Sequence, residues 1–110
     1  MLRSTIRMRI PPQKRSEALL ILVSLSEQVQ FEKGCISCRL YCGVEDADVI
    51  LLEELWSNFE DLHRHLRSHR YRELLLVVEM AAEPPEIRFD TIAQTSGMET
   101  IEKARTAPVG

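Results

Sequence analysis

The sequence predicts an α+β fold in which four strands and two helices follow one another as strand, helix, strand, strand, helix, strand. Four segments carry apolar side chains at every second position, as in strands with one buried face. Two longer segments carry them every three to four positions instead, as in amphipathic helices. Proline pairs at positions 11–12 and 84–85 mark two of the boundaries between these patterns.

The first strand is expected over residues 2–10, where apolar or small side chains alternate with arginine and threonine. Pro11 and Pro12 end this strand, and proline suits the first turn of a helix. A long helix is then expected over residues 13–33, with Gly34 placed to stop it. Its apolar stripe comprises Ala18, Leu22, Leu25 and Val29.

The second and third strands are expected over residues 35–43 and 49–56, joined by an acidic turn at residues 45–48. A link this short predicts an antiparallel hairpin. The third strand begins apolar on both faces, which is typical of a central strand. The side chains expected to point inward from the second strand are Ile36, Cys38, Leu40 and Cys42.

The second helix is expected to begin at Ser57–Glu60, which matches the capping-box pattern. Its apolar stripe comprises Phe59, Leu62 and Leu66. A break is expected at Ser68 and His69, followed by a further helical piece that Pro84 and Pro85 end. The last strand is expected over residues 86–93, with Ile87, Phe89 and Thr91 on one face.

This order of elements is the ferredoxin-like, or split βαβ, arrangement. Both helices then cover one face of a four-stranded antiparallel sheet. The other face still carries apolar side chains, which two chains packing sheet to sheet would cover. We therefore expect a homodimer of a domain formed by residues 1–93. Residues 94–110 are expected to form a mobile tail, with a dimer-clasping arm as the alternative.

Length and charge exclude several classes of function. A chain of 110 residues is one domain by length. Its net charge of −3 provides no basic surface for nucleic acid or for an anionic membrane. No apolar run is long enough to span a bilayer, and arginines interrupt the N-terminal segment where a signal peptide would be apolar. We expect a cytoplasmic protein.

The three cysteines suggest a redox or zinc site, but the strand pattern disfavours it. Cys35 and Cys38 are three residues apart on a strand, so they point to opposite faces. Cys38 and Cys42 share a face but lie about 13 Å apart along the strand, too far for one disulfide or one metal ion. The expected state is three reduced thiols.

Several short motifs resemble the antibiotic biosynthesis monooxygenase family over residues 2–93. Ile10-Pro11 ends the first strand before a long helix, and Glu32-Lys33-Gly34-Cys35 leads into the second strand. Glu54-x-Trp56 ends the third strand. The second helix then carries the family's pattern at Phe59, Leu62, His65, Leu66 and Ser68.

The resemblance implies a dimeric α+β barrel, with a ligand pocket in each monomer between the sheet and the helices. The family includes cofactor-independent oxygenases of polycyclic phenols, haem-degrading enzymes and many proteins of unknown activity. The haem-degrading members have an asparagine on the first strand, which is missing here. Their helix-two tryptophan falls at His65, and their haem-ligating position falls near Leu75. These departures disfavour haem breakdown.

Oxygenation without a cofactor needs a base, donors that hold a substrate anion, and an apolar pocket. No glycine-rich nucleotide loop is present, so no flavin or nicotinamide cofactor is indicated. His65 is the candidate base, because it titrates near neutral pH and lies at the edge of the buried stripe. The alternative is a histidine at the helix boundary making an ordinary hydrogen bond.

Four other residues are candidates for binding the substrate. Trp56 either stacks on a planar ligand or fills the core beneath the second helix. Glu54 has the same strand parity as Trp56, and it is either an acid–base group or half of a structural ion pair with Arg39, His65 or His69. Tyr71 is placed to close the pocket. His69 shares the face of His65 if the helix continues.

The sequence therefore predicts a cofactor-independent monooxygenase acting on a small aromatic or enolisable metabolite, with dioxygen as co-substrate. His65 would be catalytic, and Trp56, His69, Tyr71 and Glu54 would bind substrate. No metal site is indicated, because the two histidines lack further ligands in a matching motif. The alternative is a non-catalytic dimeric module that binds a small ligand or a partner protein.

Overall fold

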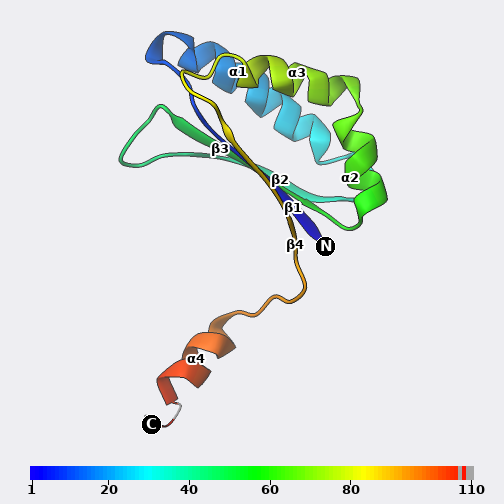
Figure 1. Ribbon diagram of the computed structural model, residues 1–110, viewed down its shortest axis with the longest axis vertical. Helices are drawn as coiled ribbons and strands as arrows, with labels where there is room; N and C mark the ends of the chain where they lie inside the picture. The colour runs from blue at the N-terminus through cyan, green and yellow to red at the C-terminus, as the bar shows by residue number, and fades with distance from the viewer. Residues whose placement is uncertain (107, 109–110) are drawn as a thin grey trace.

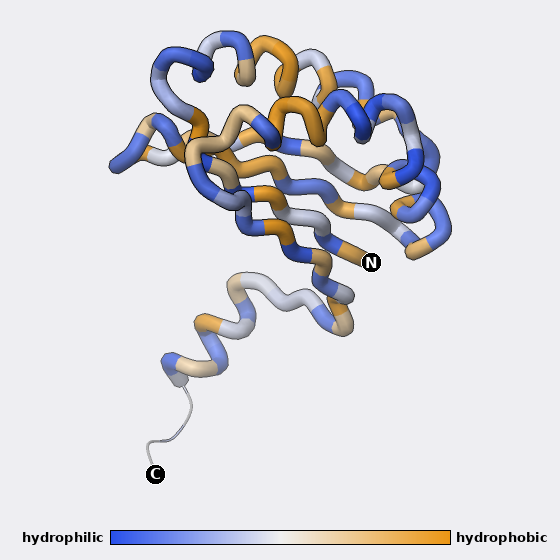
Figure 2. The backbone as a smooth tube through the Cα atoms, turned by 45° about the horizontal axis from the view of Figure 1, so that its top comes forward, coloured by the Kyte–Doolittle hydropathy of each residue, from blue (hydrophilic) through white to orange (hydrophobic). Residues whose placement is uncertain are grey.

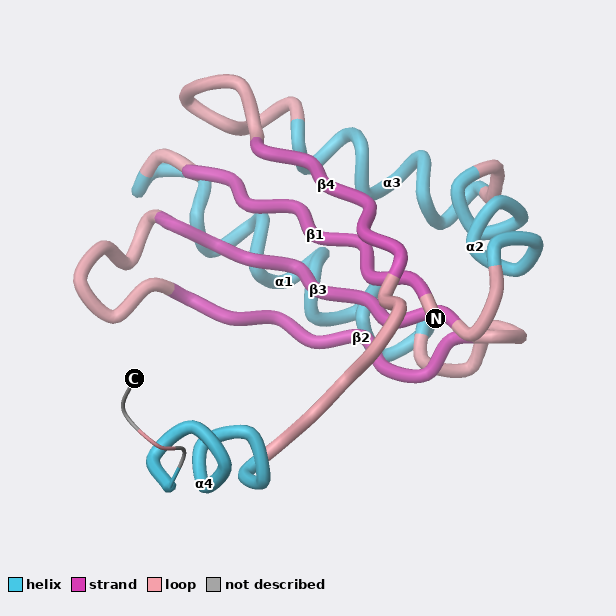
Figure 3. The backbone as a smooth tube through the Cα atoms, turned by 60° about the horizontal axis from the view of Figure 1, so that its bottom comes forward, coloured by secondary structure: helices cyan, strands magenta, loops and turns pink. Residues whose placement is uncertain are grey.

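The computed structural model describes residues 1–106 and 108 and contains four strands and four helices (Figure 1). The strands form one antiparallel sheet in the order β2-β3-β1-β4 (Figure 3). This is the predicted ferredoxin-like arrangement. The elements are β1 (Leu2–Arg9), α1 (Pro12–Val29), β2 (Cys35–Cys42), β3 (Val49–Trp56), α2 (Phe59–Leu66), α3 (His69–Val78), β4 (Glu86–Thr91) and α4 (Met98–Thr106).

The helices α1 and α3 lie side by side over one face of the sheet, and α2 lies at one end of it (Figure 1). The opposite face of the sheet carries no helix in the described part of the chain (Figure 3). This confirms the prediction that the helices cover a single face. It leaves one side of the two central strands without cover from the protein's own helices.

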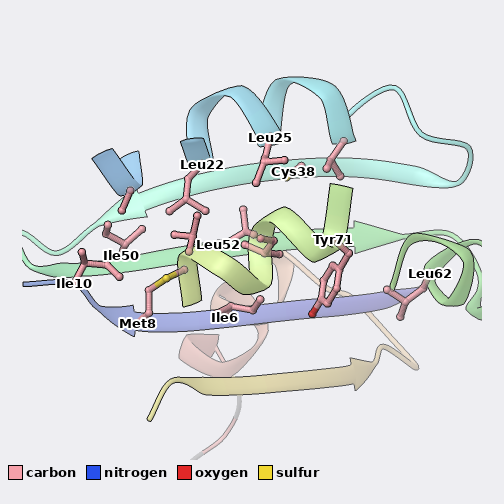
Figure 4. Close-up of a cluster of buried hydrophobic side chains, with 14 of the residues drawn as sticks. Ile6, Met8, Ile10, Leu22, Leu25, Cys38, Ile50, Leu52, Leu62 and Tyr71 are labelled. Atoms are coloured by element: carbon pink, nitrogen blue, oxygen red, sulfur yellow. The ribbon is translucent and has the colours of Figure 1, made fainter. Parts of the chain in front are cut away.

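The core lies between the sheet and the two long helices. Along β1 hydrophobic residues alternate with polar ones, whereas β3 begins with a continuous apolar run (Figure 2). In β3 it is burial that alternates from one residue to the next. Leu22 and Leu25 project from α1 toward Ile50 and Leu52 of β3 (Figure 4). The positions of β1 and β3 at the centre of the sheet explain why their inward side chains are almost completely buried.

The long helix ends at Val29, four residues before the predicted end at Lys33. The backbone N–H groups of Phe31 and Glu32 bond to carbonyls three residues back, so the chain tightens into a turn. Gly34 follows with φ of +85°, a conformation that side chains other than glycine's rarely adopt. Glu32 therefore lies in a turn rather than on the helix.

The start of α2 also differs from the prediction by one residue. Asn58, and not Ser57, is the N-cap, and its side-chain oxygen accepts a 2.8 Å hydrogen bond from the backbone N–H of Asp61. The predicted break between the two helical pieces is confirmed. Ser68 caps α3 by accepting a 3.1 Å hydrogen bond from the backbone N–H of Tyr71.

Two edge strands bury less than their sequence pattern suggested. Ile36 and Cys42 were expected to point inward, but both are exposed, and the register of β2 shifts between Cys35 and Ser37. On β4, Ile87 and Phe89 are more than 40% exposed. Edge strands extend beyond the cover of the helices, so alternation along them does not guarantee burial.

The last helix, α4, projects away from the sheet (Figure 1) and has no buried residue among those described. It lies within residues 94–110, the segment that was expected to form a tail. None of the described helices combines the length and the apolar character needed to cross a membrane.

Candidate active site

A buried histidine marks the place where α2 meets the sheet. Leu62 and His65 form the inward side of α2, and His65 is only 2% exposed. The side chain is held there because the Asn58 cap fixes the start of the helix and the Ser68 cap turns the chain away two residues after Leu66. A buried ionisable ring needs partners for both of its nitrogens.

Carboxylates supply those partners on both sides of the ring. Nδ1 of His65 lies 3.1 Å from Oε1 and 3.1 Å from Oε2 of Glu32, in the turn after α1. Nε2 lies 3.1 Å from Oε1 of Glu54 on β3. That second contact is close but poorly aligned, and Nε2 makes no well-directed hydrogen bond to any described residue. It is a contact between charges when the ring is protonated.

Two aromatic side chains enclose the ring. The Trp56 ring stacks on the imidazole with 4.6 Å between centroids, and Tyr71 meets it edge-on at 5.3 Å. The Trp56 indole Nε1–H also donates a 3.0 Å hydrogen bond to Oε1 of Glu54. Glu54 and Trp56 are two residues apart on β3, so both project toward the helices.

The arrangement continues outward from Glu32 to the surface. Nη1 of Arg70 lies 3.2 Å from Oε2 of Glu32, and its Nε donates a 3.2 Å hydrogen bond to the Gln28 side chain. A surface depression of about 320 Å³ lies over this point. It is lined by Gln28, Ser68, His69, Arg70 and Glu73. Charged groups thus run from the depression through Glu32 and His65 to Glu54.

The surrounding charges favour the protonated ring. Burial alone lowers the pKa of His65, but the contact with Glu54 and the charges of Glu54 and Glu32 outweigh it. The pKa of His65 is therefore raised above its ordinary value. Burial, reinforced by the charge of Glu54, raises the pKa of the Cys35 thiol to about 11 and also raises that of the Tyr71 hydroxyl. Both of those groups stay neutral at physiological pH.

Four of the five residues named from the sequence meet here: His65, Glu54, Trp56 and Tyr71. His69 does not join them. The helix breaks after Leu66, so His69 starts a new helix and lies exposed in the surface depression. Among the partners considered for Glu54, the structure shows His65. Arg39 is exposed and pairs in register with Glu53, on the opposite face of the sheet.

Sequence reasoning missed Glu32 and Arg70. Glu32 was placed in the last turn of the long helix expected over residues 13–33, and it lies 33 positions before the histidine that it contacts. The available signals were its place two residues before Gly34, where a helix was expected to end, and its membership of the Glu32-Lys33-Gly34-Cys35 motif. Among the described residues, no cluster of three or more histidine, cysteine, aspartate or glutamate side chains is arranged to hold a metal ion.

The fold is shared with solved structures of other proteins. A conserved protein from Methanosarcina mazei is 27% identical, with a TM-score of 0.75 over 81% of this chain and 89% of its own. A proposed antibiotic biosynthesis monooxygenase from Deinococcus radiodurans is 15% identical, with a TM-score of 0.82 over 89% of this chain and 98% of its own. At that identity the likeness concerns the fold alone.

A curated relative and a family model extend the comparison to sequence. An uncharacterized protein from Synechocystis is 27% identical over 88 residues, which are 79% of this chain and 60% of the relative. This chain thus matches less than two-thirds of that relative's length. The family model described as antibiotic biosynthesis monooxygenase matches residues 1–75, which include Glu32, Glu54, His65 and Arg70. The chain belongs to the antibiotic biosynthesis monooxygenase family.

Proposed function

We propose that the protein is a cofactor-independent monooxygenase that removes a proton from a small aromatic or enolisable metabolite and lets the resulting anion react with dioxygen. The observation that carries this proposal is the buried His65 held between two carboxylates, with both ring nitrogens 3.1 Å from a carboxylate oxygen. Groups with perturbed proton affinity that face one another in a dry site are typical of acid–base catalysis.

The base in this proposal is the pair formed by His65 and Glu54. Two groups this close titrate as one unit, so the proton taken from the substrate belongs to the pair. The Trp56 indole bonds to Oε1 of Glu54, and in the described part of the chain Oε2 receives no hydrogen bond. Oε2 is therefore the atom best placed to accept a substrate proton, while the imidazolium stabilises the carboxylate.

The chemistry balances with dioxygen as the oxidant. For an anthrone, loss of a proton from the methylene carbon gives an electron-rich anion. The anion passes one electron to dioxygen, and the resulting radical pair forms a carbon–oxygen bond. The product of that step is a peroxide anion, which takes back the proton from the pair of His65 and Glu54 and becomes a hydroperoxide. Loss of water from the hydroperoxide then leaves a carbonyl. One oxygen atom ends in the product and the other in water.

Oxygen uptake with anthrones, hydroquinones and electron-rich phenols tests this proposal. We expect uptake by the wild type and at least a hundredfold loss in His65→Ala, the lower range for removing an acid–base group. His63→Ala is the matched control, because His63 is exposed on the same helix and stacks on Phe59 instead. With labelled dioxygen, one labelled atom should enter the product. Equal rates in His65→Ala and the wild type would remove His65 from the mechanism.

A second function is favoured by how completely the site is filled. Trp56 is 0% exposed and Glu54 is 2% exposed, and the depression near Arg70 lies at the surface rather than beside them. A module that binds a ligand or partner without converting it would need no access to His65. No uptake on any compound, together with ligand binding that His65→Ala leaves unchanged, would favour this function.

We also propose that the protein is a homodimer that packs sheet to sheet. Leu51 and Leu55 of β3 point away from the helices and are only half-buried in the single chain. Tyr41 of β2 extends this apolar surface and is 44% exposed. An apolar face on central strands gains stability when a second copy covers it.

A further inference from the structure

We propose that Glu32 is the positioning residue of this site, holding the proton on Nδ1 of His65 so that Nε2 alone exchanges a proton with Glu54. This inference rests on the proposed proton-transfer function of the same site. Glu32 lies in the turn after α1, outside both the Glu54-x-Trp56 motif of β3 and the helix α2 that carries His65. The inference concerns the protein without substrate, so it can be tested before any substrate is known.

The geometry at Nδ1 is that of a donor shared by two acceptors. Both carboxylate oxygens of Glu32 lie 3.1 Å from this nitrogen. A carboxylate accepts and does not donate, so the bond forms only when Nδ1 carries its proton. The partner of one ring nitrogen decides which tautomer a histidine adopts. Glu32 therefore selects the Nδ1-protonated ring.

Glu32 is itself held in place from both sides. Arg70 binds its Oε2 at 3.2 Å and is tied in turn to Gln28 of α1. The Glu32 side chain is 18% exposed, so its charge is only partly screened by water. The turn that carries Glu32 is shaped by Gly34 at φ +85°. A carboxylate anchored by an arginine and a rigid turn keeps its orientation when the ring changes protonation state.

The consequence appears at Nε2. With the Nδ1 proton held by Glu32, a neutral ring would present the lone pair of Nε2 to Oε1 of Glu54 at 3.1 Å. Two acceptors facing each other at that distance repel, so a proton between them is favoured. The pair therefore holds one exchangeable proton at rest. This proton keeps the ring cationic, so that the free oxygen of Glu54 can accept the substrate proton in the proposed reaction.

Other groups near the ring do not supply that proton. Cys35 and Cys38 on β2 and Tyr71 on α3 lie close to Glu54, and burial raises the pKa of each, so they remain neutral. Within α2 itself, Asp61 is paired with Arg64 at 2.7 Å. Glu32 from the turn and Glu54 from β3 are thus the charged groups that face the ring directly, with Arg70 acting through Glu32.

Nitrogen NMR of the histidine rings, recorded from pH 5 to pH 9, tests the inference. In the wild type we expect Nδ1 of His65 to stay protonated throughout while Nε2 titrates. In Glu32→Gln the amide oxygen can still accept from Nδ1, but the negative charge is gone. We expect proton binding by His65 to weaken about tenfold or more, because a charge at hydrogen-bond distance is lost.

Glu73→Gln is the matched control. The substitution makes the same chemical change as Glu32→Gln, and Glu73 lines the same surface depression as Arg70 but makes no contact with His65. The titration curve of His65 in Glu73→Gln should coincide with that in the wild type. The wild-type spectra also decide the tautomer without any variant, so a poorly folded Glu32→Gln does not leave the question open.

Two results would overturn the role of Glu32. One is a wild-type ring whose neutral form carries its proton on Nε2, and the other is unchanged proton binding in folded Glu32→Gln. Oxygen uptake is measured separately on the same proteins. A protein without uptake but with the expected spectra would refute the monooxygenase proposal and keep the role of Glu32. Oxygen uptake by the wild type, together with the same proton binding by His65 in Glu32→Gln as in the wild type, would keep the monooxygenase proposal and refute the role of Glu32.

Discussion

Nε2 of His65 lies 3.1 Å from Oε1 of Glu54, so a histidine from α2 and a glutamate from β3 form a charged pair with almost no exposure to water. Burying two charges is unfavourable, and removing one partner leaves the other uncompensated. The pair therefore has consequences for stability that can be measured whether or not the protein is an enzyme.

Glu54→Gln should destabilise the fold. At pH 6 we expect a loss of about 3 kcal/mol in the free energy of unfolding, because the imidazolium loses its buried counter-charge. The loss should be smaller at pH 8, where the ring can be neutral. Urea unfolding at both pH values measures it. Glu27→Gln is the control, since Glu27 is exposed on α1, and its effect should stay within about 0.5 kcal/mol.

The stability of the wild type should fall as pH rises above the ordinary pKa of histidine. The pKa of His65 is raised in the folded state, so the folded protein binds more protons than the unfolded chain in this range. The stabilisation is fully present below about pH 6.5 and is lost as pH rises through the folded pKa. Urea titrations between pH 5.5 and pH 8 follow this change. In His65→Gln the pH dependence over that window should flatten, and an unchanged slope would argue against the assignment.

Gly34→Ala should be strongly destabilising. Gly34 has φ of +85°, and an added Cβ would collide with the side chain of Asp61. We expect a loss of about 2 kcal/mol or more, since the backbone strain and the collision add. Thermal unfolding measures it. Gly97→Ala serves as control, because the nearest atom to a Cβ there belongs to a flexible exposed side chain. Equal melting temperatures for the two variants would contradict this explanation.

Leu51→Glu should weaken the proposed dimer. Leu51 is half-buried on the face of β3 that points away from the helices, and a charge there would have to be buried between two sheets. Sedimentation velocity should show a dimer for the wild type and a monomer for the variant at micromolar concentration. Leu20→Glu on α1 is the control, because Leu20 is 76% exposed on the helix side. A monomeric wild type would refute the sheet-to-sheet assembly.

Removal of residues 94–110 should leave the free energy of unfolding unchanged within about 0.5 kcal/mol. None of the described residues of α4 is buried, so we expect the helix to contribute little packing to the rest of the protein. Urea unfolding and sedimentation velocity of the shortened chain test both readings of the tail. A shift from dimer to monomer would favour the dimer-clasping arm over the mobile tail.

The sequence by itself determined the order of elements, the central position of the third strand and the break between α2 and α3. Each of these depends on local causes: the period of apolar residues, the proline pairs and the Ser68 cap. The resemblance to the family, together with strand parity and the apolar stripe of the second helix, brought His65, Glu54 and Trp56 into consideration together. The sequence pattern was less reliable at the edges, where Ile36 and Phe89 are exposed despite correct alternation.

Only the tertiary structure decided what surrounds the histidine. Because α1 ends early, at Val29, the turn that follows places Glu32 against Nδ1 of His65. These two residues are 33 positions apart in the chain. The same packing separates His69 from the cluster, although it lies only four residues further along the chain. Periodicity specifies which face of an element is buried. Which charged side chains meet beneath that face depends on how turns and helix ends place distant segments against one another, and no local pattern encodes that.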